Sequence, residues 1–330
     1  MRKVMGICIA LFIVTVSFNP AWGIEGKGIA ATADLIFTAP DDAIVALGSD
    51  KKENVHVITE GGAIFSIAAH RKPRKIYSGL RKCPFSLTSS AVLPDGSLVV
   101  NDCVDDKDVL IKVNQNGNKT TLMKLEESLV SMASDTSGQI YLGVWLSEGN
   151  LTVVSNPSHL TSADSIRGQV LSVGKDNTLT NLYEGGLPFA VAASKGGLYV
   201  SLWGRKGPLN PGNKSYSVSD PRHIFWICLS DTVEIRRLQS NQNNRMLTDK
   251  LDAVSSIAAG KDNVIFAYGI TKDGKRGIYM IKGERPPQRL LFTKEGMDKG
   301  ITGLAFSGNN LFFSTVGGKV YRVGVNNRMN

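Results

Sequence analysis

One short pattern recurs six times along the chain: an apolar strand with a central alanine, a turn rich in Gly or Asn, and a second apolar strand. The first two copies contain Val45-Ala46-Leu47-Gly48 and Ser90-Ala91-Val92-Leu93. The alanines of the other four copies are Ala133, Ala192, Ala258 and Ala305. A unit that recurs roughly every 45 residues restricts the fold more than any single motif, because each copy must bury its apolar face against its neighbours.

A third and a fourth strand follow each copy. Val109–Val113 and 318–323 are typical third strands, and fourth strands share the pattern of 75–77, 121–123, 181–183 and 289–292. Helical periodicity is absent, and β-branched and aromatic runs bounded by Gly, Asn and Asp recur instead. Four strands repeated six times predict an all-β fold: a six-bladed β-propeller with four-stranded antiparallel blades.

The sixth copy ends before its fourth strand. Residues 34–37, Asp-Leu-Ile-Phe, have the fourth-strand pattern and precede the first blade. We therefore predict that this N-terminal strand closes the ring by completing blade six, which removes an exposed sheet edge. The central alanines fit the same geometry, because the innermost strands crowd around a narrow channel.

The first 23 residues have the features of a signal peptide: Arg2-Lys3, an apolar run over 4–18, and Ala21-Trp22-Gly23 as a small-x-small cleavage pattern. An uncleaved anchor is the alternative, but the run is shorter than the ~20 apolar residues that a span needs. We expect 1–23 to be removed, 24–330 to form a single propeller domain, and the protein to be secreted or periplasmic. No later segment is apolar enough to span a membrane. Hydrophobic residues make up 42% of the chain, which excludes a disordered polar protein.

Cys83 and Cys103 flank a predicted hairpin whose turn is 94–96, Pro-Asp-Gly. We predict that they form a disulfide across antiparallel strands, with two separate buried thiols as the alternative. Cys228 lies in an apolar run and is interpreted as a core residue. No CxxC pair occurs, which argues against a zinc ribbon or thioredoxin-type chemistry.

Two insertions, over 146–166 and 205–222, exceed what the blades need. Both follow the second strand of their blade, so they are expected to rise beside each other on one face of the disc. Function concentrates in loops carried by a rigid scaffold, and this face is the predicted binding site.

Trp145 and Trp203 stand at the bases of these insertions, with Asp102 and Cys103 at the corresponding point of blade two. The two indoles could form an aromatic platform for an apolar or sugar ring, or each could cap the core beneath its loop. His159 and His223 lie at or within the insertions and complete the candidate ligand-binding set. No paired-His spacing occurs, so no metal site and no cofactor are expected.

The segments 135–141, 167–171, 186–194 and 224–226 give the chain a resemblance to strictosidine-synthase-like proteins. The chain also resembles, more broadly, the gluconolactonase, paraoxonase and NHL-type propellers. The resemblance is clearest over about 90 residues. It implies the propeller fold and, with less force, a lyase or hydrolase activity.

Metal-dependent members of that group hold a divalent cation with Asn and carboxylate side chains two residues before the inner-strand Val-Ala. The equivalent positions here are Ala43, Thr88, Val130, Phe189, Ser255 and Thr302. None offers a carboxylate or amide oxygen, so we predict that a calcium-dependent lactonase site is absent. The acid/base glutamate of strictosidine synthases also has no counterpart.

The formal charge is +9, and basic residues cluster over 70–75, at Arg81-Lys82 and over 272–276. A solvated rim is one interpretation, and a polyanionic surface partner is the other. Nucleic acid is not expected, because the basic runs have no interleaved aromatic residues.

Two functions therefore remain open. The first is an exported propeller that binds a small molecule or a protein on the insertion face without catalysis. The alternative is a metal-independent, strictosidine-synthase-like or lactonase-like enzyme, a lyase or hydrolase. The sequence favours binding over catalysis.

Overall fold

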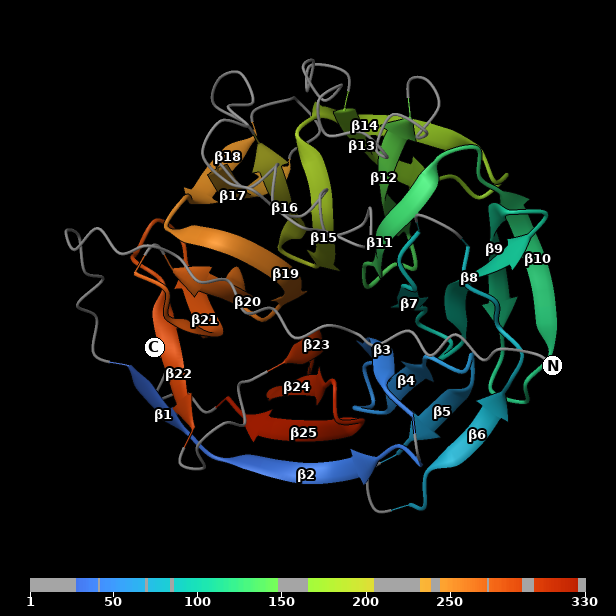
Figure 1. Ribbon diagram of the computed structural model, residues 1–330, viewed down its shortest axis with the longest axis horizontal. Helices are drawn as coiled ribbons and strands as arrows, with labels where there is room; N and C mark the ends of the chain where they lie inside the picture. Colours follow the sequence, from blue (N-terminus) through green and yellow to red (C-terminus); the bar gives the residue numbers. More distant parts are fainter. Residues whose placement is uncertain are drawn as a thin grey trace, which may run out of the picture.

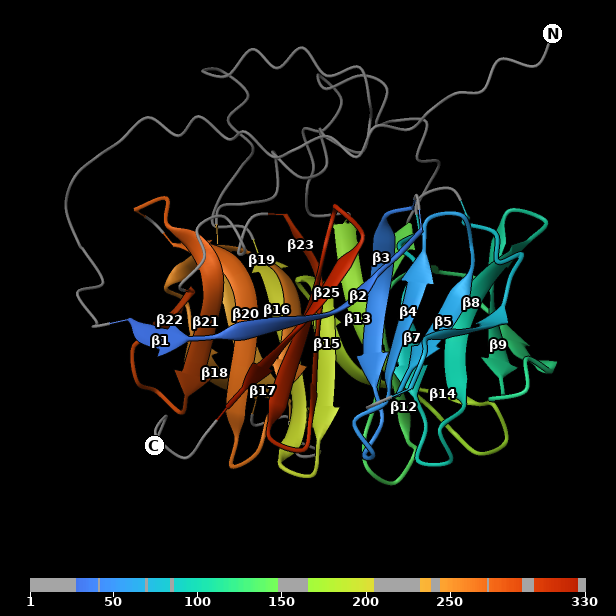
Figure 2. The same ribbon diagram turned by 90° about the horizontal axis from the view of Figure 1, so that it is seen from below.

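The structure is a computed structural model and describes residues 28–40, 42–68, 71–83, 86–147, 166–204, 232–238, 244–271, 273–292 and 300–325. Within these ranges the chain forms strands and no helix. Six sheets stand around a central axis, as Figure 1 shows, and Figure 2 shows the resulting disc from the side. The predicted six-bladed, all-β propeller is confirmed. No helix in the described ranges has the length and hydropathy needed to cross a membrane.

Each of the first three blades is an antiparallel meander that runs outward from the axis. Blade one contains β3 (Ile44–Ser49), β4 (Val55–Thr59), β5 (Ile64–Ile67) and β6 (Arg74–Tyr77). Blade two contains β7 (Ser90–Val92), β8 (Leu98–Val104), β9 (Lys107–Val113) and β10 (Lys119–Lys124). Blade three contains β11 (Ser128–Ser134), β12 (Ile140–Ser147), β13 (Ile166–Val173) and β14 (Leu179–Gly185).

The last three blades follow the same order. Blade four contains β15 (Leu187–Ser194), β16 (Gly197–Gly204), β17 (Thr232–Leu238) and β18 (Arg245–Thr248). Blade five contains β19 (Leu251–Ala259), β20 (Val264–Thr271), β21 (Arg276–Lys282) and β22 (Gln288–Phe292). Blade six contains β23 (Ile301–Ser307), β24 (Asn310–Thr315) and β25 (Lys319–Gly324).

An N-terminal strand closes the ring, as predicted. β2 (Ala33–Thr38) pairs antiparallel with β25 and becomes the outer strand of blade six. Phe37 is buried there against Val57 of blade one and Val320 of blade six, which ties the two ends of the ring together. A further strand, β1 (Ile29–Ala31), pairs parallel with β22 and adds a fifth strand to blade five. This fifth strand was not predicted.

The core lies between blades rather than within any one of them. Ala46, Ile58 and Ile64 of blade one pack in a single cluster with Leu98 and Val100 of blade two. The same kind of cluster joins the other blade pairs. Each blade therefore depends on its neighbours for burial, which is the behaviour that the sequence repeat predicts.

Serine hydroxyls link the inner strands across three blade boundaries. The inner strands are sheet edges at the axis, so some of their backbone N–H groups have no partner within the ladder. The N–H of Met132 donates to Ser89 Oγ at 2.8 Å, that of Val191 to Ser131 Oγ at 2.9 Å, and that of Leu304 to Ser256 Oγ at 3.0 Å. These bonds fix the height of one blade relative to the next.

A β-bulge sets the register of five inner strands. The ladder skips one inner-strand residue three positions before the central alanine: Val130, Phe189, Ser255 and Thr302. In blade one the skipped residue is Val45, so Gly48 takes the alanine position. The sequence alignment of blade one at Ala46 was therefore wrong by two residues, because the bulge fixes the register and the alanine does not.

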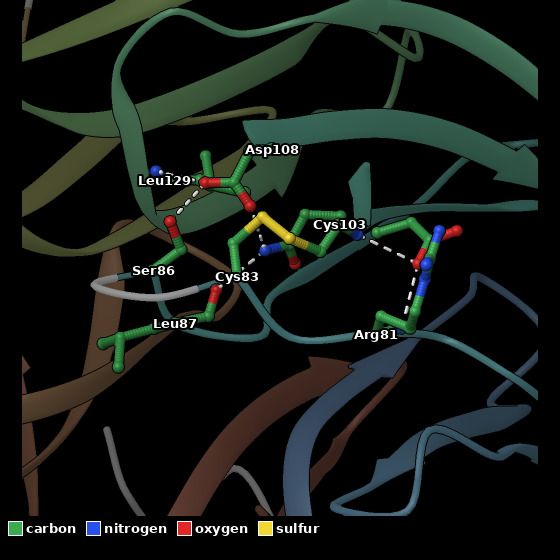
Figure 3. The surroundings of a disulfide bond; sticks show 9 residues. Arg81, Cys83, Ser86, Leu87, Cys103, Asp108 and Leu129 are labelled. Atoms are coloured by element: carbon green, nitrogen blue, oxygen red, sulfur yellow. Dashed lines mark hydrogen bonds between the residues drawn. A yellow bond between two sulfur atoms is a disulfide. The ribbon is translucent and has the colours of Figure 1, made fainter. Parts of the chain in front are cut away.

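The predicted disulfide is confirmed. Cys83 and Cys103 are bonded, with their Cα atoms 4.9 Å apart. Cys103 lies on β8, whereas Cys83 lies before β7 in a segment without regular secondary structure, so the bridge does not join two strands. Figure 3 shows Arg81, Leu87 and Asp108 around it. A buried disulfide indicates an oxidising compartment.

Buried polar groups hold the segment on both sides of Cys83. The N–H of Arg81 donates to Asp102 Oδ1 at 2.9 Å, and Ser86 Oγ donates to Asp108. Asn101 Nδ2 donates to the carbonyl of Leu87 at 3.1 Å. The segment is therefore fixed by hydrogen bonds as well as by the covalent bridge.

Replacing both cysteines with serine is expected to lower the free energy of unfolding by about 3 kcal/mol, because the unfolded chain gains the entropy of an open loop of about this length. Urea titration of the Cys83→Ser, Cys103→Ser variant measures the loss. Dithiothreitol should destabilise the natural protein by a similar amount and leave the variant unchanged. Equal stability of the two proteins would contradict a structural role for the bridge.

Candidate functional site

A cavity of about 500 Å³ lies on the ring axis, and all six blades line it. Its walls are the second halves of the inner strands and the turns that follow them. The wall residues at the central position are small: Gly48, Ala133, Ala192, Ala258 and Ala305. Larger side chains there would close the channel, so the cavity is a direct consequence of the repeated small residue.

The turns at the cavity mouth are built by Asp side chains. Asp50 Oδ1 accepts from the N–H groups of Lys52 and Asn54, and Asp135 Oδ1 accepts from those of Ser137 and Gln139. Burial opposes ionisation of Asp135, but these bonds outweigh it and hold the pKa of that carboxyl below its usual value. Both carboxylates are therefore committed to turn geometry.

Three lysines also line the mouth. Lys51 Nζ donates to the carbonyl of Thr136 at 2.9 Å, and Lys261 Nζ donates to Asn309 Oδ1 at 2.7 Å. The third, Lys195, is exposed. The Lys51 side chain therefore joins blade one to blade three at the edge of the cavity.

The cavity lies toward the end of the disc opposite to the insertions. Its lining includes the turns between first and second strands, whereas the insertions start at the other end of the second strands, after Ser147 and Gly204. The insertions themselves, 148–165 and 205–231, lie outside the described residues. The binding face predicted from the sequence therefore remains a prediction, and this cavity is an additional site that was not expected.

The structure confirms that Trp145 and Trp203 are equivalent. In each blade the position is four residues beyond the partner of the central alanine. It is occupied by Trp145 in blade three, Trp203 in blade four and Cys103 in blade two. Trp145 is half-buried and packs on the cluster that contains Val130 and Phe189. This packing supports the capping interpretation for Trp145, and the side chain of Trp203 lies outside the described part.

Asp102 is not near the axial cavity lining. Its side chain is buried and pairs with Lys119, with Asp102 Oδ2 at 2.8 Å from Nζ. Burial raises its pKa, but the bonds from Lys119, Arg81 and Cys103 outweigh burial and lower it overall. His159 and His223 lie outside the described residues, so their proposed ligand contacts remain predictions.

The positions considered for a calcium site in the sequence analysis coincide with the bulges in five blades. Correcting blade one places Val45 there instead of Ala43, beside Thr88, Val130, Phe189, Ser255 and Thr302. In the part of the chain that the structure describes, no group of three or more His, Cys, Asp or Glu side chains could hold a metal ion.

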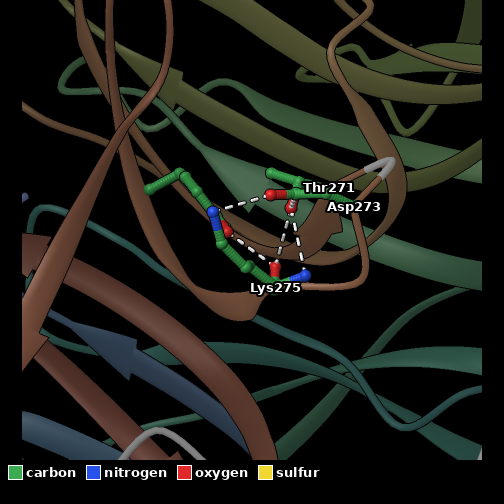
Figure 4. Close-up of polar contacts among 4 residues, drawn as sticks. Thr271, Asp273 and Lys275 are labelled. Carbon is green, nitrogen blue, oxygen red and sulfur yellow. Dashed lines mark hydrogen bonds and ion pairs between the residues drawn. The ribbon is translucent and has the colours of Figure 1, made fainter. Parts of the chain in front are cut away.

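One of the basic stretches is neutralised locally. Lys275 Nζ lies 2.8 Å from Asp273 Oδ2, and Asp273 also contacts Thr271, in the hairpin between β20 and β21 shown in Figure 4. The bond from Lys275 lowers the pKa of Asp273. Lys275 therefore already has an anionic partner, and a polyanionic surface partner remains a prediction for the other basic residues.

Two buried polar side chains near the cavity belong to no recognisable sequence motif, so the sequence alone does not identify them as candidate site residues. Ser90 lines the cavity and is 8% exposed, and His56 on β4 is 1% exposed. Burial lowers the pKa of His56 to about 4, and the nearby Asp50 carboxylate opposes this shift only in part. His56 is therefore neutral at physiological pH. Aligning the six copies at the bulge would show both residues as exceptions.

No protein-family model and no curated protein matches this sequence. Solved structures do match. The PQQ-bound aldose sugar dehydrogenase of Streptomyces coelicolor is 12% identical, covers 89% of this chain and 98% of its own, and has a TM-score of 0.60. A gluconolactonase of Xanthomonas campestris is 10% identical, with coverages of 91% and 97% and a TM-score of 0.56.

The virginiamycin B lyase of Staphylococcus aureus is 12% identical, covers 89% of this chain and 98% of its own, and has a TM-score of 0.54. At these identities the likeness shows the fold, which is that of the gluconolactonase-type propellers. The resemblance found in the sequence is borne out at that level. Activity does not follow from it.

The buried His56 predicts how stability changes with pH. Its pKa is near 6.5 when unfolded and about 4 when folded, so the unfolded chain binds the extra proton first as pH falls. Stability should therefore drop by about 3 kcal/mol between pH 6.5 and pH 4. Urea titrations at several pH values measure this slope.

The matched variant is His56→Phe, because Phe266 and Phe312 hold the equivalent positions of blades five and six. The variant should fold and should lose most of the slope over this pH range. Asp95, whose pKa is 3.8 in the unfolded chain and about 2 in the folded protein, begins to contribute only at the lower end of this range. An unchanged slope in His56→Phe would show that another group causes it.

Proposed function

We propose that the protein is an enzyme of the lactonase-like kind that acts on a small, uncharged organic molecule bound in the axial cavity. The observation that carries the proposal is the cavity itself, with about 500 Å³ enclosed by all six blades. Pockets of this size accommodate small organic ligands. The fold neighbours add support, because they are named as a lactonase, a lyase and a sugar dehydrogenase.

The lining favours an uncharged substrate. Its walls are apolar or small, including Val191, Ile257 and Leu304. Asp50 and Asp135 at the mouth are already engaged in their turns. The charged lining residues all lie in the turns at the mouth, so a charged group held against the strand walls would lose its hydration without a partner of opposite charge. Hydrolysis of a lactone fits this environment, since water opens the ring ester and only the product carries a charge.

Binding without chemistry is the second candidate. It is favoured by one specific observation: the cavity lining in the described part holds no pair of free carboxylates for general acid–base work, because Asp50 and Asp135 serve as turn caps. Turnover measurements separate the two candidates, and both place the small molecule in the same cavity.

Export forms part of the proposal. The N-terminal pattern over 1–23 supports it, and the Cys83–Cys103 bridge supports an oxidising destination such as the periplasm or the extracellular space. The small-molecule substrate would then be met outside the cytoplasm.

Filling the cavity tests the proposed site. Ala259 lines the cavity, and the equivalent residue of blade six is Phe306, which stacks on Phe266 with ring centroids 5.6 Å apart. Ala259→Phe should therefore fold. It should lower kcat/KM on glucono-1,5-lactone, or the affinity for it if no turnover occurs, by at least about tenfold. A pH-stat follows hydrolysis.

Leu179→Phe on the outer strand β14 is the control, because Leu179 is 38% exposed and far from the axis. EDTA should leave activity unchanged if no calcium takes part. Full activity in Ala259→Phe would exclude the axial cavity and return attention to the insertion face.

A further inference from the structure

Ser90 breaks a rule that the other five blades obey. The inner-strand residue just before the small central position is apolar everywhere else: Leu47, Met132, Val191, Ile257 and Leu304. In blade two the ladder places Ser90 at this position, opposite Val100. The repeat thus serves as an internal comparison, and it shows that an apolar side chain at this position is compatible with the fold.

His56 breaks a second rule. The residue paired with the small central position is aromatic in four blades and valine in one: Tyr141, Tyr199, Phe266, Phe312 and Val99. In blade one that residue is His56, opposite Gly48. A polar ring therefore replaces an aromatic plug in the blade next to Ser90.

The two exceptions face the same blade interface. His56 lies on the face of β4 that carries Ile58, and Ser90 is the cross-strand partner of Val100. Ile58 and Val100 belong to one buried cluster between blades one and two. His56 and Ser90 therefore project toward each other's blade.

Gly48 leaves room between them. A Cβ atom on Gly48 would lie 3.7 Å from Ser90 Oγ and 2.7 Å from Val92 Cγ2. Because His56 is the cross-strand partner of Gly48, its imidazole stands beside this space. Glycine at position 48 lets the inner strand of blade one approach Ser90 and Val92 of blade two closely.

Both side chains lack hydrogen-bond partners within the described structure. Nδ1 and Nε2 of His56 and Oγ of Ser90 are inaccessible to solvent and unpaired. An unsatisfied buried polar group destabilises the folded state. The other five blades have an apolar side chain at the position of Ser90, and an aromatic ring or valine at the position of His56, so folding alone does not explain this unsatisfied pair.

The chemistry of the pair selects the ligand. A neutral imidazole can accept a hydrogen bond from the Ser90 hydroxyl, and Ser90 Oγ can then accept one from a donor in the cavity. A carboxylate offers no hydrogen-bond donor to Ser90 Oγ. An ammonium group beside Ser90 would find no carboxylate on the strand walls, because Asp50 and Asp135 are engaged in their turns and Asp262 lies in the turn of blade five at the mouth. A hydroxyl group offers a hydrogen-bond donor to Ser90 Oγ and carries no charge.

We propose that Ser90 and His56 form the polar anchor of the axial cavity and hold a hydroxyl group of an uncharged organic ligand. Ser90 is the contact residue: it lines the cavity, and the proposal requires its Oγ, which is buried in this structure, to turn toward the cavity by rotation about the Cα–Cβ bond when the ligand binds. His56 does not line it and is a positioning residue that orients the Ser90 hydroxyl. This inference rests on the proposed function, because it assigns the polar contact of the same cavity.

The test compares two rings of equal size, 1,5-anhydro-D-glucitol and tetrahydropyran, of which only the first carries hydroxyl groups. Binding is followed by NMR titration of the natural protein and of Ser90→Val, which copies Val191 of blade four. Ser90→Val should weaken binding of 1,5-anhydro-D-glucitol at least about tenfold and leave tetrahydropyran unchanged. Thr120→Val, at an exposed residue of the outer strand β10 away from the cavity lining, is the control and should change neither.

The role of His56 has its own readout. The imidazole ¹⁵N resonances of His56 in the natural protein should shift when 1,5-anhydro-D-glucitol is added and should stay in place with tetrahydropyran. This measurement decides the question even if Ser90→Val does not fold. His56→Phe should weaken the binding of 1,5-anhydro-D-glucitol by a smaller factor than Ser90→Val does.

The failures are distinguishable. If 1,5-anhydro-D-glucitol binds with no shift of His56, or if Ser90→Val and Thr120→Val behave alike, the anchor is wrong while the cavity remains a binding site. If neither ring binds, the assigned ligand class is wrong. If binding of both rings survives Ala259→Phe, the cavity is not the site and the proposed function fails with it.

Discussion

Crowding at the ring axis governs this structure. Six inner strands converge there, and each must present Gly or Ala where they come closest, from Gly48 in blade one to Ala305 in blade six. The small residues let the strands approach closely enough for serine hydroxyls to accept backbone N–H groups across blade boundaries. The same smallness leaves a cavity of about 500 Å³ on the axis. The core, the links between blades and the candidate site thus have one origin.

A repeat protein supplies its own controls, and that is the main basis for assigning a role to Ser90 and His56. Each structural position of the blade occurs six times in the same chain. A polar residue at a position where the other copies are apolar or aromatic is therefore a departure that packing does not require. The polar departures at these two paired positions fall in adjacent blades, at a shared interface next to the cavity. Three unsatisfied polar atoms follow from them. A ligand hydroxyl bound to Ser90, with the Ser90 hydroxyl bonded to His56, would satisfy two of these three atoms and would explain the departure.

The sequence predicted the ring but not its register. The alanine pattern and strand count gave six blades, and 34–37 was placed correctly as the closing strand because its pattern matches other fourth strands. The Cys83–Cys103 bridge was also found. Blade one was misaligned by two residues, since a β-bulge at Val45 adds a residue that leaves no mark in the composition. β1 escaped notice because a short parallel edge strand has no repeat to match.

The axial site was missed for a related reason. Ser90 and His56 differ from the equivalent residues of the other blades only once the bulge has fixed the register. Without that register they are one serine and one histidine among apolar residues. The most direct measurement of the account is a crystal structure of the protein soaked with 1,5-anhydro-D-glucitol. We expect the ring in the axial cavity with a hydroxyl oxygen at hydrogen-bond distance from Ser90 Oγ and the Ser90 hydroxyl directed at His56. Density for the ring only on the insertion face, with the axial cavity filled by other contents, would contradict it.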